Sequence, residues 1–542
     1  MCQEEERSMK LKVGKIILAA PVVLIVLWLL GRATSTVQLP DRVELDLFAA
    51  PTDQSFTLRE AFDGLSEGDG QKENALLIED NRVAWLERWR LLQNADQRLD
   101  ICYFILKQDV FGVSFLGHLV KKAQEGVQIR VLLDAIGVKM SRSFQGNDYL
   151  DALVNTGRVN IRMYRPLIYR YSDAFLTLNP AAVFISEHDK ILLADDMTAL
   201  IGGRNISTDY FAPPEDNHKA FRDTDILLSG RKIGRALEKA FSAEYDSGES
   251  KSVNHEVIDL KDSKEDLLLA YRAMDAWLHG RPIPAEVAKS IEDRNLPWMD
   301  ELSRVPNLRG ALKEKRPAAI SSDMRIVDSR CRLIKADDPI TRSLIQFVRS
   351  AREEIFIQSP YLALPTQAVK MLAEASARGV RITVITNSPE SSDNPMSQGV
   401  FLEQWPELLA QVPTLKLYVA SNQHNLHGKV AVIDRQLVLV GTYNLDPLSI
   451  ALNSELIAVG WSQPLAEAVQ GPREAEIAQG ENLIQYRIAR DSHGKPIRDS
   501  KGGVVVKFGA QDHLDLSDYG TTRRYRWLYR YISKIKGTYP WY

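Results

Sequence analysis

Residues 187–207 read EHDKILLADDMTALIGGRNIS, and residues 426–446 read LHGKVAVIDRQLVLVGTYNLD. The two stretches align without a gap, and each carries His-x-Lys followed by four residues and an Asp. A Gly and then an Asn recur at the same offsets further on. The shared positions are His188, Lys190, Asp195, Gly202 and Asn205 in the first copy, and His427, Lys429, Asp434, Gly441 and Asn444 in the second. One such pattern is a weak signal, but two with equal offsets indicate a duplicated unit.

A second repeat lies upstream of each copy. Residues 119–134 read LVKKAQEGVQIRVLLD, and residues 372–387 read LAEASARGVRITVITN. Both follow an apolar strand and predict an amphipathic helix that ends at a Gly, then a buried parallel strand. Gly126 and Gly379 stand where a helix end favours a left-handed residue. The chain is therefore expected to be an α/β protein with two related halves, each opening with a β-α-β unit.

The repeated pattern predicts a site for a phosphodiester. Because side chains alternate along a strand, each His shares a face with its Lys, and the following hairpin brings the Asn alongside. Two copies that face each other supply two imidazoles, two ammonium groups and two amides. One His can attack phosphorus while the other acts as acid and base, and Lys190, Lys429, Asn205 and Asn444 can hold the charge that develops. We expect no metal and no cofactor, since the lysines supply the positive charge.

Four acidic residues complete the predicted site. Asp225 and Glu455 each precede a Gly by five residues in matching strands, and we expect each to accept a ring N–H from a His. Asp195 and Asp434 belong to the catalytic motif, and we expect them to have a structural task at the hairpin, bonding backbone amides or a basic residue. The pair Asp195–Asp196 also resembles metal ligands, but the sequence places no third ligand.

Composition sets broad limits on the 542-residue chain. Apolar residues make up 45% and charged residues 26%, which excludes a disordered, collagen-like or multi-pass membrane protein. The three cysteines are too few for a disulfide framework. With 71 acidic against 68 basic residues, the net charge of -3 does not point to nucleic acid.

Both ends of the chain suggest a membrane. Residues 16–30 are uncharged and follow Lys10, Lys12 and Lys15, so we expect a single-pass signal-anchor with the catalytic body on the non-cytoplasmic side. A cleaved signal peptide or a buried core helix remain alternatives. Residues 521–542 hold six basic residues and no acidic one, interleaved with aromatic and aliphatic residues. On a helix, Arg526 and Arg530 would share one face and Trp527 and Leu528 another, which favours a membrane surface over nucleic acid.

These motifs resemble the phospholipase D superfamily over about residues 76–461. Within it, the chain is most similar to bacterial cardiolipin synthases of the C-type branch, on the segments GGRNISTDYF, FRDTD, ADDP, ITNSPESSD and LDPLSIALNSEL. The resemblance implies an α/β/α sandwich for each half, one active site between the halves, and transfer through a phosphohistidine. It also implies that His188 is the nucleophile and His427 the acid and base. In the family, the motif continues with Gly-Ser-x-Asn. The Ser position is occupied by Thr442 in the second copy and by Gly203 in the first, so only Thr442 keeps a hydroxyl, and it is expected to bind phosphate.

The resemblance implies a bacterial inner-membrane enzyme that moves a phosphatidyl group onto phosphatidylglycerol to make cardiolipin. Phosphatidylethanolamine is an alternative donor, and no nucleic-acid partner is expected. Hydrolysis by the same site, as a phospholipase D or a phosphodiesterase, remains an alternative because water and an alcohol use one chemistry. A silent membrane scaffold is a third possibility. The expected domains are an anchor (1–40), a linker (41–75), the first half (76–250), a helical insertion (251–330), the second half (331–470), and a C-terminal hairpin with a basic tail (471–542).

Overall fold

The computed structural model describes residues 56–65, 72–140, 149–177, 180–253, 261–330, 338–422 and 424–532. The predicted anchor at residues 16–30 lies outside these ranges, so it stays a prediction. Among the described residues, no helix is both long and apolar enough to cross a bilayer.

The elements of the first half alternate between strands and helices. They are β1 (Lys72–Ile78), α3 (Asn81–Asn94), β2 (Arg98–Tyr103), α4 (Val110–Gln124), β3 (Gln128–Asp134), α5 (Ala135–Met140), α6 (Tyr149–Val154), β4 (Val159–Tyr164), α7 (Leu167–Thr177), β5 (Ile191–Ala194), β6 (Thr198–Gly202), α8 (Thr208–Phe211), β7 (Asp225–Ser229), α9 (Arg231–Tyr245) and β8 (Ser250–Ser252). The helices α10 (Lys261–Leu278), α11 (Ala285–Asp293) and α12 (Trp298–Ser303) follow.

The second half repeats this order. It contains β9 (Ile320–Ser329), α13 (Pro339–Ser350), β10 (Glu354–Gln358), α14 (Thr366–Ala377), β11 (Arg381–Thr386), α15 (Pro395–Gln411), β12 (Leu415–Ala420), β13 (Lys429–Ile433), β14 (Leu437–Gly441), α16 (Pro447–Ala451), β15 (Glu455–Trp461) and α17 (Gln463–Gln479). The chain ends with β16 (Leu483–Ile488), β17 (Val506–Phe508) and α18 (Gly520–Ile532), and α2 (Leu58–Asp63) precedes β1 within the predicted linker.

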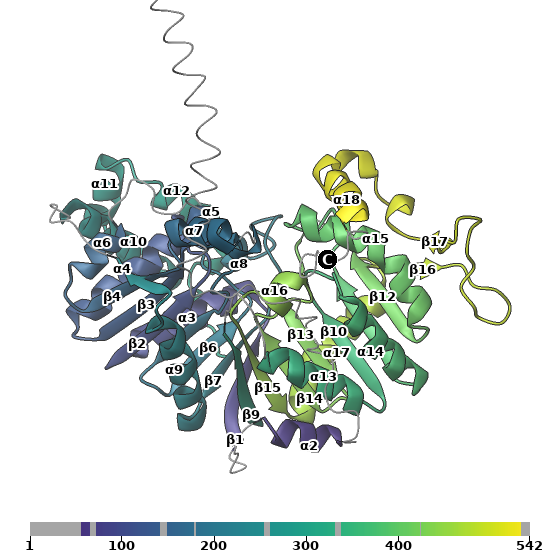
Figure 1. The fold of residues 1–542 in the computed structure, drawn as a ribbon. Helices are drawn as coiled ribbons and strands as arrows, with labels where there is room; N and C mark the ends of the chain where they lie inside the picture. The colour runs from purple at the N-terminus through teal and green to yellow at the C-terminus, as the bar shows by residue number, and fades with distance from the viewer. Residues whose placement is uncertain are drawn as a thin grey trace, which may run out of the picture.

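The strand pairings relate the two halves by a pseudo-dyad. In the first half they run β8-β4-β3-β2-β5-β6-β7-β1, and in the second half β9-β15-β14-β13-β10-β11-β12-β16. The two series join where β1 pairs antiparallel with β9, between the two halves in the lower middle of Figure 1. The strands on either side of α4 are parallel, and so are the strands on either side of α14, as the repeat predicts.

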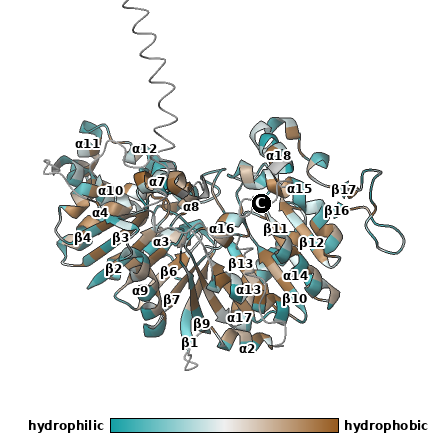
Figure 2. Ribbon diagram, in the orientation of Figure 1, coloured by the Kyte–Doolittle hydropathy of each residue, from teal (hydrophilic) through white to brown (hydrophobic). Residues whose placement is uncertain are grey.

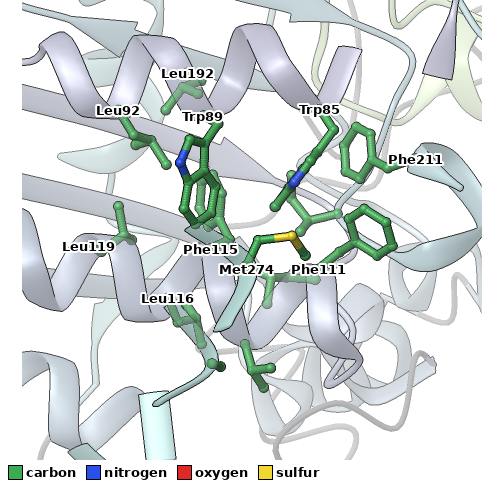
Figure 3. Close-up of a cluster of buried hydrophobic side chains, with 14 of the residues drawn as sticks. Trp85, Trp89, Leu92, Phe111, Phe115, Leu116, Leu119, Leu192, Phe211 and Met274 are labelled. Atoms are coloured by element: carbon green, nitrogen blue, oxygen red, sulfur yellow. The ribbon is translucent and has the colours of Figure 1, made fainter. Parts of the chain in front are cut away.

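Apolar side chains on both faces of the strands build three layers, which gives the α/β/α arrangement. One core lies between the first half's strands and α3, α4 and α10, a second lies under α13, α14 and α15, and a third lies between the strands and α9 and α17. Figure 2 shows the apolar residues concentrated along the strands. Trp85, Trp89, Phe111, Phe115 and Met274 pack together in the first core (Figure 3).

The segment predicted as a helical insertion differs in part from that description. Helix α10 buries Leu267, Ala270 and Met274 against α4, so it completes the first half's core. The approach is close, because a Cβ at Gly117 of α4 would lie 1.9 Å from the Leu267 carbonyl oxygen. The segment also ends in β9, a strand that pairs with β1 and β15.

Candidate active site

His188 stands just before β5, at the edge where the parallel strands β2, β3 and β4 end. Its Nδ1 lies 3.0 Å from each carboxylate oxygen of Glu455, which begins β15 in the other half. Because a carboxylate only accepts hydrogen bonds, Nδ1 carries the proton and Nε2 keeps its lone pair. Burial lowers the pKa of His188 to about 4, against the opposing effect of Glu455, so the imidazole is neutral at pH 7.

His427 occupies the matching place before β13 and has a carboxylate partner of its own. Its Nδ1 lies 2.6 Å from Oδ2 of Asp223, in the first half. The rings of Tyr210 and Phe221 pack against the imidazole, with centroids 5.4 and 5.5 Å away. Burial and the charge of Lys429 lower the pKa of His427. Although burial opposes it, the charges of His427 and Lys429 hold the pKa of Asp223 below its usual range.

Each histidine is therefore oriented by the half to which it does not belong. The backbone repeats this exchange, because the His188 N–H donates to the Ser454 carbonyl at 3.2 Å and the His427 N–H donates to the Arg222 carbonyl at 2.7 Å. Neither half contains both members of either imidazole–carboxylate pair. The site consequently exists only where the two halves meet.

The two lysines bring positive charge into this buried junction. Lys190 Nζ donates to the His188 carbonyl at 2.6 Å, and Lys429 Nζ donates to the His427 carbonyl and lies 3.1 Å from its Nε2. Burial lowers the pKa of each lysine to about 8. The charge of Lys429 also lowers the pKa of His188, and that of Lys190 lowers the pKa of Lys429, so the cations of both halves act on one space. An anion bound there would relieve their repulsion.

The predicted role of Asp225 was wrong, and the strand register explains why. Asp225 pairs with Arg88 at 2.8 Å and with Arg204 at 3.2 Å, away from either histidine. In the first half Gly202 lies opposite Asp225, but in the second half Gly441 lies opposite Ile457. The two halves therefore correspond with a shift of two residues. The structural equivalent of Glu455 is Asp223, which sequence alignment on the downstream glycines had missed.

Asp195 and Asp434 hold backbone amides, at the far end of the strand from each histidine. Asp195 accepts from the amides of residues 96, 97 and 98 at 2.8–2.9 Å, and Asp434 accepts from those of residues 352, 353 and 354 at 2.8–2.9 Å. Both have positive φ, 53° and 50°, at their hairpin turns. A strand of four or five residues, roughly 13–16 Å, separates them from the chemistry. They are anchors of the hairpin and not reacting groups.

Thr442 donates to the carboxylate that faces His188, which differs from the phosphate-binding role predicted for it. Its Oγ1 donates to Glu455 at 2.5 Å, and Ser449 Oγ donates to the other oxygen of Glu455 at 2.5 Å. Gly203 takes the corresponding place in the first half, where a Cβ would lie 2.1 Å from Asp223 Oδ1. The missing side chain at residue 203 thus makes room for Asp223.

The two asparagines of the motif differ in their hydrogen bonds. Asn205 uses both ends of its amide within the protein, accepting from the Ile105 N–H and donating to the Tyr210 hydroxyl at 3.0 Å each. Asn444 is also buried, but its Oδ1 has no hydrogen-bond partner. Only the second copy therefore keeps an amide oxygen available. Across the described ranges, no group of three or more His, Cys, Asp and Glu residues is arranged to hold a metal ion.

A family model described as "Cardiolipin synthase, PLD-like domain" matches residues 89–244 and 344–472. The match covers more than half of the chain and includes both histidine motifs, so the chain belongs to this family. It is an enzyme of the phospholipase D superfamily, of the phosphatidyltransferase type.

Individual proteins and a solved structure are also similar to this chain. Cardiolipin synthase C of Escherichia coli K12 is 26% identical over 469 residues, which cover 79% of this chain and 90% of that protein. An uncharacterized protein of Helicobacter pylori is 24% identical over 433 residues, covering 76% of this chain and 81% of its own. The crystal structure of a phosphatidylserine synthase of Haemophilus influenzae shares the fold, with a TM-score of 0.57 at 13% identity over 88% of this chain and 98% of that one.

Proposed function

We propose that this enzyme makes cardiolipin by transferring a phosphatidyl group to phosphatidylglycerol through a covalent intermediate on His188. The observation that carries the proposal is the crossed pairing of two imidazoles with carboxylates of the opposite halves. Both pairings use Nδ1, so the Nε2 atoms are the reactive ones. Family membership supports a phospholipid as the substrate class.

In the first step, Nε2 of His188 attacks the phosphorus of the donor lipid and the bond from phosphorus to the headgroup oxygen breaks. Two features favour His188 for this role: its low pKa leaves it unprotonated, and 12% of its side chain is exposed against 5% for His427. Glu455 stabilises the imidazolium character that develops. For this step His427 carries a second proton on Nε2, which the charges of Asp223 and of the bound phosphodiester stabilise, and it gives that proton to the departing oxygen, so glycerol leaves when the donor is phosphatidylglycerol.

In the second step, a hydroxyl of the acceptor phosphatidylglycerol gives its proton to His427 and attacks the same phosphorus. The bond between phosphorus and Nε2 of His188 then breaks, which regenerates the free imidazole. Asp223 stabilises the protonated form of His427 in both steps, because it is an ionised carboxylate 2.6 Å from Nδ1.

The lysines stabilise the charge on phosphorus in both transition states. A phosphodiester brings one negative charge to two buried ammonium groups, and its two non-bridging oxygens can accept from Lys190 and Lys429. Asn444 Oδ1 remains as a buried acceptor for a substrate hydroxyl.

One assay tests this function. Purified enzyme is incubated with labelled phosphatidylglycerol, with and without phosphatidylethanolamine, and the lipid products are separated. Cardiolipin formation by the unsubstituted enzyme, together with its loss in both the His188→Ala and the His427→Ala variants, supports the proposal. Phosphatidic acid as the only product would show a hydrolase, cleavage of DNA would show a nuclease, and activity in both variants would refute the site.

The proposal includes a bacterial inner-membrane location, with the body on the non-cytoplasmic face. Helix α18 supports contact with lipid, since its outward face carries Arg523, Arg524, Trp527 and Leu528. The two predicted faces are present, but Arg526 and Arg530 turn toward α15, where they pair with Glu403 at 2.9 and 2.8 Å. Labelling of engineered cysteines in spheroplasts with an impermeant reagent tests the location, and protection of body positions until lysis would contradict it.

A further inference from the structure

Helix α7 has an inverted distribution of polar and apolar residues. Its outward face carries Ile168, Tyr171 and Phe175, at positions i, i+3 and i+7, with exposed fractions of 73%, 53% and 44%. Its inward face carries Arg170, which is fully buried. A soluble helix normally presents the opposite arrangement. The outward face of α7 is therefore suited to an apolar environment.

The helix is fixed directly to the catalytic centre. Arg170 donates to Oδ2 of Asp134 at 2.6 Å. The same oxygen accepts a hydrogen bond from the backbone N–H of Glu187 at 2.9 Å, and Glu187 directly precedes His188. On its other side, Ala174 of α7 packs against a small buried cluster that includes Ile185 and, from α16 in the second half, Ala451. Whatever contacts the outward face of α7 is thus held beside the active site.

The surroundings of this face select a lipid surface as its occupant. Lys251 Nζ lies 5.4 Å from the centroid of the Tyr169 ring, and the acidic Asp173 pairs with Arg165 at 2.6 Å. Helices α7 and α18 lie at the same end of the molecule, one on each half, as Figure 1 shows, and the apolar stretches of α7 stand out at that end in Figure 2. The site lies at this end too, because α7 follows the last parallel strand of its half. Tyrosine, aliphatic and basic residues together are typical of membrane interfaces.

We propose that α7 inserts Ile168, Tyr171 and Phe175 into the interfacial layer of an anionic bilayer, and that α7 and α18 together turn the active site toward the lipid. The inference deepens the proposed function and rests on it, since a phospholipid substrate must leave the bilayer to reach His188. Two contacts on opposite halves fix the orientation of the molecule, which a single tail cannot do.

A depth measurement tests the contact on the full-length enzyme reconstituted in phosphatidylglycerol-containing vesicles. An environment-sensitive fluorophore is attached at Phe175→Cys, with Cys2 and Cys331 replaced by serine, and the matched control is Met197→Cys, which is 40% exposed on the β5–β6 turn at the far end of the strands. We expect lipids brominated on their acyl chains to quench the first probe and leave the second unchanged. Equal quenching at both positions, or none at Phe175→Cys, would overturn the proposal. Absence of quenching at Phe175→Cys would also be obtained if residues 16–30 or a second copy of the chain covered α7.

An activity measurement separates this inference from the proposed function. The variant Ile168→Ser/Tyr171→Ser/Phe175→Ser is compared with Met197→Ser/Ile497→Ser on vesicles and on a monomeric short-chain phosphatidylglycerol. We expect turnover on vesicles to fall by about tenfold or more in the α7 variant alone, with turnover of the short-chain lipid unchanged. Unchanged turnover on vesicles would refute the docking role of α7. Absence of any transfer in the unsubstituted enzyme would refute the function instead.

Discussion

Each histidine pairs with a carboxylate of the opposite half, so removing the charge of Asp223 should impair catalysis, and Asp225, two residues away, provides the matched control. Asp223→Asn removes the charge that stabilises protonated His427. A hydrogen bond to a charged group contributes about 1.5–3 kcal/mol, and about 1.4 kcal/mol corresponds to a factor of ten in rate. The 2.6 Å bond is fully buried, so the whole range applies, and kcat should fall roughly 10- to 150-fold while the fold is kept.

Asp225→Asn should have the opposite signature. The substitution leaves the buried guanidinium groups of Arg88 and Arg204 without their carboxylate. Breaking a buried ion pair costs about 3–5 kcal/mol of stability, so Tm should fall clearly while kcat of the folded fraction stays within a few-fold. Cardiolipin formation and thermal unfolding are measured on both variants. An active Asp223→Asn enzyme, together with an inactive Asp225→Asn enzyme of unchanged Tm, would refute the two-residue shift between the halves.

Three further predictions concern the rest of the site. Asp195→Asn and Asp434→Asn should each lower Tm, because each carboxylate accepts hydrogen bonds from three backbone amides. The kcat of the folded enzyme should change less than about threefold. A large loss of kcat at constant Tm would instead indicate a catalytic role for these residues. Because both lysines have pKa values near 8 and act as cations, kcat/KM should fall as pH rises through about 8. The fall in kcat should come at higher pH than the fall in kcat/KM, because the bound anionic substrate raises the pKa values of both lysines. A value of kcat/KM that stays constant from pH 7 to 10 would contradict their role as cations. Thr442→Val should lower kcat by about five- to tenfold, through Glu455, with KM nearly constant, whereas a rise in KM alone would indicate direct binding of phosphate.

Much of the site was predictable because the duplicated motif fixes residue types and spacing. His188, Lys190, His427 and Lys429 converge because each pair opens a strand at the same edge of its half. The β-α-β order and the parallel strands also follow from local sequence. These features depend on short-range periodicity and chain order, which a single sequence records directly.

The errors arose where a contact depends on register or on tertiary packing. A shift of two residues keeps a side chain on the same face of a strand, so hydropathy cannot distinguish Asp223 from Asp225 as the partner of His427. The hydroxyl of Thr442 was assigned to phosphate from the family resemblance, because the sequence does not show that it lies beside Glu455 of another strand. The basic residues of α18 were expected to face lipid, yet Glu403 of α15 binds two of them. Such pairings join residues that are far apart in sequence.

The central claim, one site with His188 as nucleophile, is tested most directly by trapping the intermediate. The variant His427→Ala is mixed with a phosphatidyl ester labelled on phosphorus that releases p-nitrophenolate, a leaving group that needs no acid. We expect a burst of one p-nitrophenolate per chain and an alkali-stable label on the peptide that contains His188, with no burst in His188→Ala. Label on His427 in the His188→Ala variant, or no covalent label in either variant, would contradict it.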